Sequence, residues 1–338
     1  MPASRPLAVT ALLAASALGL AACGGGTPDG GADAGSAGAG GVLSVVTSTN
    51  VFGNIASVVG GEDVEVTSIV DSLSQDPHSY EATVQDKLSV SEADLVIENG
   101  GGYDTFLGRL AEETGVGAVL NAVELSGLED AAESEEHADE AAGHAEEAES
   151  SEAGHADEDG HGHGAFNEHV WYDLPAMVTL ADAIADELGR LDGANADAYQ
   201  ERADAFAAEL QPVQDRLAAL AAEGAGKEVA VTEPVPAYLL EAAGLENVTP
   251  EGFSEAVEEE TDVPVAALNE MKDLVSGGRL AFLAYNDQTE GSQTEAVRSA
   301  ADGAGLPVLD FTETLPDGED YVSWMTANTD TVEAALEG

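Results

Sequence analysis

The chain has 338 residues, and its 66 acidic residues against 10 basic ones give a formal net charge of -56 at pH 7. A surface this acidic repels nucleic acid and anionic lipid and concentrates cations around itself. Cys23 is the single cysteine, which excludes an intramolecular disulfide and a thiolate-rich metal site. Adaptation to high salt would give the same general acidity, so composition alone does not identify a function.

Residues 1–23 predict a lipoprotein signal peptide. Arg5 precedes a short apolar run of small residues that ends in Leu-Ala-Ala-Cys23, the pattern of a lipobox. The run is too short for a membrane span, and no later stretch is long and apolar enough for one. Residues 24–41 read as a flexible Gly/Ala tether. We therefore expect Cys23 to be lipidated and to anchor the protein at the extracytoplasmic face of the cell membrane; the alternative is an ordinary cleaved signal.

From about residue 42 the sequence alternates between strand and helix patterns. A β-branched run at 42–46 predicts a strand, and an amphipathic helix follows it up to Val59. Further strands are predicted at 64–70 and 93–98, with a helical segment at 86–92 between them. This order predicts a parallel sheet covered by helices, in which ligands gather at the carboxyl ends of the strands.

One long helix is predicted over residues 195–223. Its apolar residues are spaced alternately by four and three positions, and they are Tyr199, Ala203, Phe206, Leu210, Val213, Leu217 and Leu220. Pro212 lies within the stripe and predicts a kink or a break. Strands at 228–231, 280–285 and 308–310 then alternate with helices at 237–243, 264–275 and 293–304. The predicted fold class is therefore α/β, with an N-terminal lobe (42–194), a connecting helix, and a C-terminal lobe (224–338) across a ligand-binding cleft.

Five of the seven histidines lie in an acidic segment at 129–164, and they are His137, His144, His155, His161 and His163. Such a segment cannot bury a core, and it predicts a disordered loop that binds divalent metal weakly. A merely solvated insertion is the alternative. Because metal competes with protons for imidazole, capture by this loop should fail below about pH 6. The other two histidines lie in the strings DPHSYE (76–81) and EHVWYD (168–173).

These two strings, in this order on either side of a His-rich loop, resemble a known family. With Asn99 to Tyr103 and the long helix, they are similar to the solute-binding lipoproteins of zinc and manganese ABC importers, which have a rigid helical connector between two lobes. The resemblance covers the chain from Cys23 to its C-terminus. It implies two α/β lobes and one divalent cation bound between them by four side chains.

The resemblance implies a ligand for each of the four positions. His78 and His169 match the two histidines, and Glu233 matches a third ligand that is His in many zinc-type members and Glu in many manganese-type members. The fourth, an acidic residue after a late strand, is assigned to Glu290, with Asp287 as the competing choice. Taken singly, each of the first three also fits an ordinary role, as a loop histidine, a core histidine or a helix N-terminal acid.

Asp76 and Asp173 are predicted to orient the ligating imidazoles or to fix the loops that carry them. Turn formation is at least as good an explanation for Asp76, which precedes Pro77.

Two neutral imidazoles and two carboxylates balance the charge of one divalent cation. This set suits four-coordinate Zn²⁺, and bidentate carboxylates also allow Mn²⁺. The His-rich loop favours zinc. We expect a monomeric binding protein that delivers zinc to an ABC permease; a manganese-binding protein and a surface metal buffer or adhesin are the alternatives. An enzyme such as a zinc hydrolase is disfavoured, because four protein ligands close the site and the sequence has no HExxH or nucleophile motif.

Overall fold

The computed structural model describes residues 41–129 and 166–337. The predicted signal peptide, Cys23, the tether up to residue 40, and the five histidines of the acidic segment lie outside these described residues. None of the described helices is long and apolar enough to cross a membrane.

The first half of the chain forms a four-stranded parallel sheet in the order β2-β1-β3-β4. Its strands are β1 (Leu43–Thr49), β2 (Val64–Val70), β3 (Leu95–Glu98) and β4 (Val119–Asn121). Side chains alternate between the two faces, so Val45 packs with helix α1 (Asn50–Gly60) and Val46 packs with α2 (Val84–Ser91) and α3 (Thr105–Thr114). A short helix, α4 (Ala122–Ser126), follows β4. Burial on both faces is what a β-branched parallel strand requires.

The second half forms another parallel sheet in the order β6-β5-β7-β8. Its strands are β5 (Glu228–Val231), β6 (Glu246–Asn247), β7 (Leu283–Asn286) and β8 (Val308–Phe311), and its helices are α8 (Ala237–Ala242), α9 (Ser254–Glu258), α10 (Val265–Ser276) and α11 (Ser292–Ala304). The predicted α/β class with two sheets is confirmed. The strand predicted at 280–285 begins three residues later, at Leu283.

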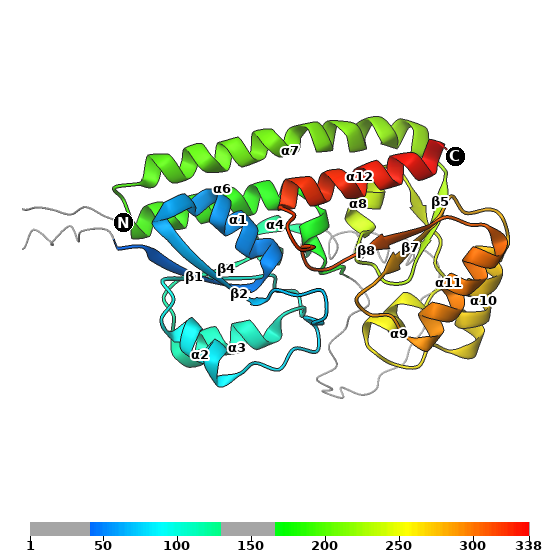
Figure 1. Ribbon diagram of the computed structural model, residues 1–338, viewed down its shortest axis with the longest axis horizontal. Coiled ribbons are helices and arrows are strands. Elements are labelled where there is room, and N and C mark those ends of the chain that lie inside the picture. Colours follow the sequence, from blue (N-terminus) through cyan, green and yellow to red (C-terminus); the bar gives the residue numbers. More distant parts are fainter. Residues whose placement is uncertain (1–40, 130–165, 338) are drawn as a thin grey trace, which may run out of the picture. The chain divides into compact units, whose positions relative to one another are not determined.

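The predicted connecting helix is confirmed as α7 (Ala196–Gly224). All seven apolar residues of its stripe are buried. Pro212 was predicted to kink or break this helix, and the helix continues through it without a break. Buried apolar residues on both sides of the proline hold the helix against its neighbours. Two long helices that the sequence analysis did not predict, α6 (Leu174–Leu191) and α12 (Tyr321–Glu337), pack along α7 (Figure 1).

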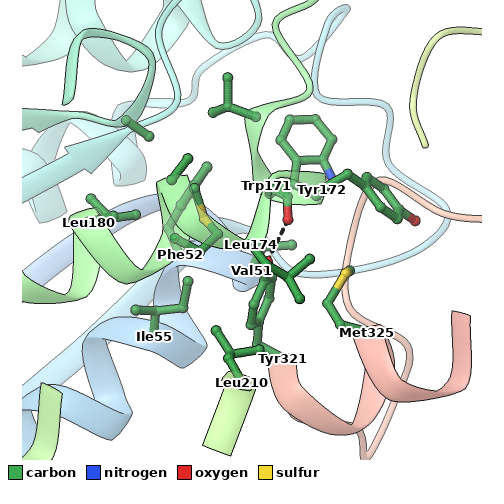
Figure 2. Close-up of a cluster of buried hydrophobic side chains, with 14 of the residues drawn as sticks. Val51, Phe52, Ile55, Trp171, Tyr172, Leu174, Leu180, Leu210, Tyr321 and Met325 are labelled. Atoms are coloured by element: carbon green, nitrogen blue, oxygen red, sulfur yellow. Dashed lines mark hydrogen bonds between the residues drawn. The ribbon is translucent and has the colours of Figure 1, made fainter. Parts of the chain in front are cut away.

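A cluster of large aromatic side chains fixes the segment that carries His169. Trp171 and Tyr172 come from a single 3-10 turn, η2 (Val170–Tyr172), and pack with Phe52 of α1 and Tyr321 of α12 (Figure 2). The Tyr321 hydroxyl donates to the Trp171 carbonyl oxygen at 2.6 Å, and the Tyr172 hydroxyl donates to the Thr312 carbonyl oxygen at 2.8 Å. Both hydroxyl bonds join this turn to the second half of the chain, and Phe52 packs against it from the first half, so the backbone next to His169 is held from both halves.

Candidate metal centre

The carboxyl ends of four parallel strands supply the polar residues of the site. His78 lies in the loop after β2, and three glycines at positive φ, Gly100 to Gly102, turn the chain after β3. Glu233 follows β5, and Glu313 follows β8. In each of the two sheets, the carboxyl ends of the parallel strands bring loop residues from distant parts of the sequence together.

His169 is completely buried, and its two ring nitrogens have different surroundings. The backbone N–H of His169 donates to Asn167 Oδ1, while Asn167 Nδ2 donates to the Pro234 carbonyl oxygen at 3.1 Å. These two bonds fix Oδ1 as the acceptor, so His169 Nδ1, 2.7 Å from it, must carry the proton. The lone pair is then on Nε2, which has no hydrogen-bond partner among the described residues.

A buried imidazole nitrogen without a partner is costly in a folded protein unless it serves a ligand. Burial, followed by the nearby His78, holds the pKa of His169 well below its usual value, so the ring stays neutral at physiological pH. A neutral imidazole with one nitrogen fixed by a hydrogen bond and the other free is the form that binds a metal ion.

His78 meets Glu313 on the other side of the same site. The His78 ring lies 5.6 Å from the His169 ring, and its Nε2 is 3.6 Å from Glu313 Oε2. The hydroxyl of the buried Tyr103 donates to Glu313 Oε2 at 3.0 Å. One ligand atom each from His78, His169 and Glu313 lies within 4.8 Å of the other two, a spacing that can hold a metal ion.

A hydrogen-bond network couples Glu233 to Glu313. Asn286 Nδ2 donates to Glu313 Oε1 at 2.7 Å and also to Glu233 Oε2. The Thr289 hydroxyl donates to the second oxygen, Glu233 Oε1, at 2.6 Å. Both carboxylates are buried, so one amide group fixes two acidic side chains at the edge of the site.

Burial disfavours the charged forms of both acids. It raises the pKa of Glu233 to about 7 and, together with repulsion from Glu233, raises the pKa of Glu313 to about 8. Within the described part of the chain, no Lys or Arg side chain forms an ion pair with either carboxylate. The site therefore lacks positive charge, and a divalent cation would supply it.

The two residues considered for the fourth ligand lie away from this group. Glu290 is exposed and accepts a hydrogen bond from the Tyr285 hydroxyl at 3.1 Å. The Asp287 side chain is 59% exposed and lies 3.9 Å from Arg298. Neither belongs to the groups of ligand atoms that the described residues form, whereas Glu313 does. Glu233 also lies outside these groups, but Asn286 links it directly to Glu313. Glu290 lies in the loop after β7, whereas the acidic residue whose ligand atom lies with those of the two histidines follows the next strand, β8.

The end of β7 and the loop after it supply side chains that position the candidate ligands instead. Asn286 is the last residue of β7, and the loop contains Thr289 and Gln288. Gln288 Oε1 accepts from the backbone N–H groups of Glu313 and Thr314 at 2.6 and 3.0 Å. Gln288 Nε2 donates to the Gln75 carbonyl oxygen, just before the His78 loop, at 3.2 Å. The sequence signal that could have found them is a run of amide and hydroxyl residues directly after a buried strand.

Asp76 and Asp173 both accept backbone hydrogen bonds. Asp76 accepts from the backbone N–H of His78 at 2.9 Å and from the Ser79 hydroxyl at 2.8 Å, which fixes the turn that carries His78. Asp173 accepts from the backbone N–H of Ala176 at 2.7 Å and thereby caps the N-terminus of α6.

The chain is similar to known proteins over most of its length. The family model described as zinc-uptake complex component A periplasmic, ZnuA, matches residues 45–335. The manganese-binding lipoprotein MntA of Halalkalibacterium halodurans is 27% identical over 87% of this chain and 88% of that protein. The metal ABC transporter substrate-binding lipoprotein FimA of Streptococcus parasanguinis is 29% identical over 77% of this chain and 79% of that protein.

Solved structures share the fold. The periplasmic zinc binding protein TroA from Treponema pallidum aligns with a TM-score of 0.66 at 20% identity, over 88% of this chain and 99% of that chain. The binding protein FpvC from Pseudomonas aeruginosa, solved in complex with Mn²⁺, aligns with a TM-score of 0.63 at 21% identity, over 87% of this chain and 98% of that chain. The chain belongs to the ZnuA family of metal-binding solute-binding lipoproteins of ABC importers, whose members are substrate-binding proteins and not enzymes.

Proposed function

We propose that the protein binds one divalent cation, with zinc as the first candidate, and that its ligands are His78, His169, Glu233 and Glu313. The observation that carries this proposal is the His169 ring, which is buried and neutral, has an unpartnered Nε2, and lies within reach of a ligand atom of Glu313. Two imidazoles and two carboxylates give a neutral complex with one divalent cation. This nitrogen and oxygen donor set suits zinc in four-coordinate geometry.

Manganese is the second candidate because half of the donors are carboxylates. Glu233 and Glu313 can bind through both oxygens and raise the coordination number, which Mn²⁺ accepts. One relative supports the same candidate, because MntA is named as a manganese-binding lipoprotein. Zinc binds more tightly than manganese to most sites of this kind, so affinity alone does not identify the ion carried in the cell.

We further propose that the captured ion passes to an ABC permease at the extracytoplasmic face of the membrane, with a lipid on Cys23 as the only anchor and the protein acting as a monomer. Support comes from the family and from the lipoprotein names of its relatives. The alternative of a surface buffer or adhesin keeps the same site but needs no permease.

One experiment separates these possibilities. Native mass spectrometry of the purified protein should show one tightly bound ion, and its identity after an equimolar zinc and manganese challenge gives the binding preference. Deletion of the gene in its own host should impair growth in chelator-treated medium. Rescue by zinc alone supports the zinc proposal, rescue by manganese alone replaces it with the second candidate, and normal growth with normal metal uptake argues for a buffer.

A further inference from the structure

A second group of possible ligands lies beside the first. It consists of His78, Glu168 and Glu258, and one ligand atom of each lies within 4.8 Å of the other two. These side chains line a cavity of about 210 Å³, together with Ser79, Gly102, Glu259 and Glu260. His78 belongs to both groups, so the two positions are adjacent.

The two acidic residues of this outer group are shielded from solvent. Glu168 is 2% exposed, and the Glu258 side chain is 9% exposed. Glu258 Oε1 has no hydrogen-bond partner among the described residues. Buried carboxylates at this spacing repel each other, so a cation between them would relieve that repulsion. With the imidazole of His78, they would balance the charge of one divalent ion.

The outer group lines this cavity, whereas His169 and Glu313 are not among the residues that line it. His78, which belongs to both groups, is 19% exposed in its side chain, against 1% for His169 and 0% for Glu313. Two neighbours in the cavity wall, Glu259 and Glu260, are exposed. The two groups share His78, and the ligand atoms of each group lie within 4.8 Å of one another, so a short displacement would bring an ion from the outer carboxylates to the inner imidazole.

We propose that His78, Glu168 and Glu258 form an outer position that takes the divalent cation first and hands it to the inner site. The transfer is a ligand exchange in which the ion keeps His78, leaves Glu168 and Glu258, and gains His169, Glu233 and Glu313. This inference rests on the proposed function of the inner site. It assigns Glu258 a role in the rate of loading rather than in the final affinity.

The test is stopped-flow loading of the full-length protein with Co²⁺, followed by tryptophan fluorescence. The Trp171 ring lies 5.1 Å from the His169 ring, so quenching reports an ion in this region. In the wild-type protein the observed rate should saturate as the Co²⁺ concentration rises, because a rapid outer equilibrium precedes the transfer. Glu258→Gln should lower the loading and release rates by about ten-fold and change the equilibrium affinity by less than about three-fold.

Glu259→Gln is the matched control, because it removes the same charge from an exposed residue in the same cavity wall. Glu168→Gln should behave like Glu258→Gln. Loading rates that are equal in Glu258→Gln and Glu259→Gln would overturn the proposal. A loss of affinity in Glu258→Gln as large as that in His169→Ala would also overturn the proposal, because Glu258 would then be an inner ligand.

A double variant gives a second readout. His169→Ala should lose tight binding but retain a weak, quenching Co²⁺ complex, which His169→Ala combined with Glu258→Gln should lose. Persistence of that weak complex in the double variant would contradict an outer position at Glu258. If the proposed function itself is wrong, the wild-type protein shows no tight one-ion complex at all, an outcome distinct from both.

Discussion

The two halves of the inner site differ in the type of ligand that they provide and in the contacts that hold each ligand in place. The first half of the chain provides imidazoles: His169 is held by Asn167 beside an aromatic core, and His78 lies on a partly exposed loop. The second half provides carboxylates, Glu233 and Glu313, which are held by the Asn286 amide at the end of β7 and, for Glu233, by the Thr289 hydroxyl in the loop after it. A neutral ligand needs only orientation, whereas two buried acids also need donors that keep them in place until a cation arrives.

The largest expected effect is the loss of a ligand from either half. His169→Ala and Glu313→Ala should each weaken zinc binding by more than about 100-fold, because each removes a donor from the inner site rather than a supporting contact. Competition against a zinc chelator measures the affinity, and circular dichroism checks the fold. Glu290→Ala is the control, since Glu290 is exposed, and its affinity should stay within about three-fold of the wild-type value. Tight binding that survives Glu313→Ala but not Glu290→Ala would restore Glu290 as the fourth ligand.

The carboxylate half should be sensitive to its supporting amide. Asn286→Ala should weaken zinc binding by about 10- to 100-fold, because it frees both Glu233 and Glu313 from their shared donor. Asn286→Gln, which keeps the amide but moves it, should lose less. Chelator competition at constant ionic strength measures both variants. An unchanged affinity in Asn286→Ala would mean that the metal orients the carboxylates without help from the protein.

The carboxylate half should also make the metal-free protein sensitive to pH. Glu233 and Glu313 keep their protons up to a pKa of about 7 and about 8 in the folded chain, whereas the unfolded chain releases them near 4.5. Between these values the folded state binds more protons, so these groups lower the free energy of unfolding as pH rises. Their stabilising contribution is therefore complete near pH 4.5 and is lost by about pH 8.

Thermal unfolding of the metal-free protein from pH 5 to pH 8 measures this dependence. Glu313→Gln should flatten it, because the amide does not titrate. Zinc should raise the unfolding temperature most at pH 8, where the acids are ready to bind without releasing protons. The same pH slope in the wild-type protein and in Glu313→Gln would show that Glu313 does not titrate in this range.

Much of the fold could be predicted from the sequence because it depends on local patterns. The strand at 64–70 matches β2, and the spacing of apolar residues from Tyr199 to Leu220 predicts α7. Helix α6 was missed although Asp173 and Pro175 form an N-terminal signal for it. Helix α12 is harder to see in the sequence, because the polar residues Asn328 and Thr329 interrupt the stripe that Tyr321, Trp324, Met325 and Val332 form at helical spacing.

The carboxylate half of the site was harder to predict than the imidazole half. His78 and His169 stand out because histidine is rare outside the acidic segment. Glu313 is one acid among 66 Asp and Glu residues, and only the register of β7 beside β8 brings its loop next to Asn286. Which acid reaches the histidines depends on tertiary packing, and a single sequence does not contain that information in local form.

The smallest effect on tight binding is expected from the acidic His-rich segment, which lies outside the described residues except for Glu129. Replacing residues 129–164 by a short Gly-Ser linker should leave one tight zinc site with an affinity within about three-fold of wild type, because His78, His169, Glu233 and Glu313 are all retained. Isothermal titration should instead lose the additional weak zinc binding, which we expect to be salt-sensitive because exposed charges are screened over about 8 to 10 Å at physiological ionic strength. A matched variant that keeps the segment but changes its five histidines to glutamine separates imidazole binding from the effect of the acidic residues. Disappearance of the tight site in the replacement, but not in the glutamine variant, would mean that the segment contributes through its carboxylates or its packing, and the four-ligand assignment would then be incomplete.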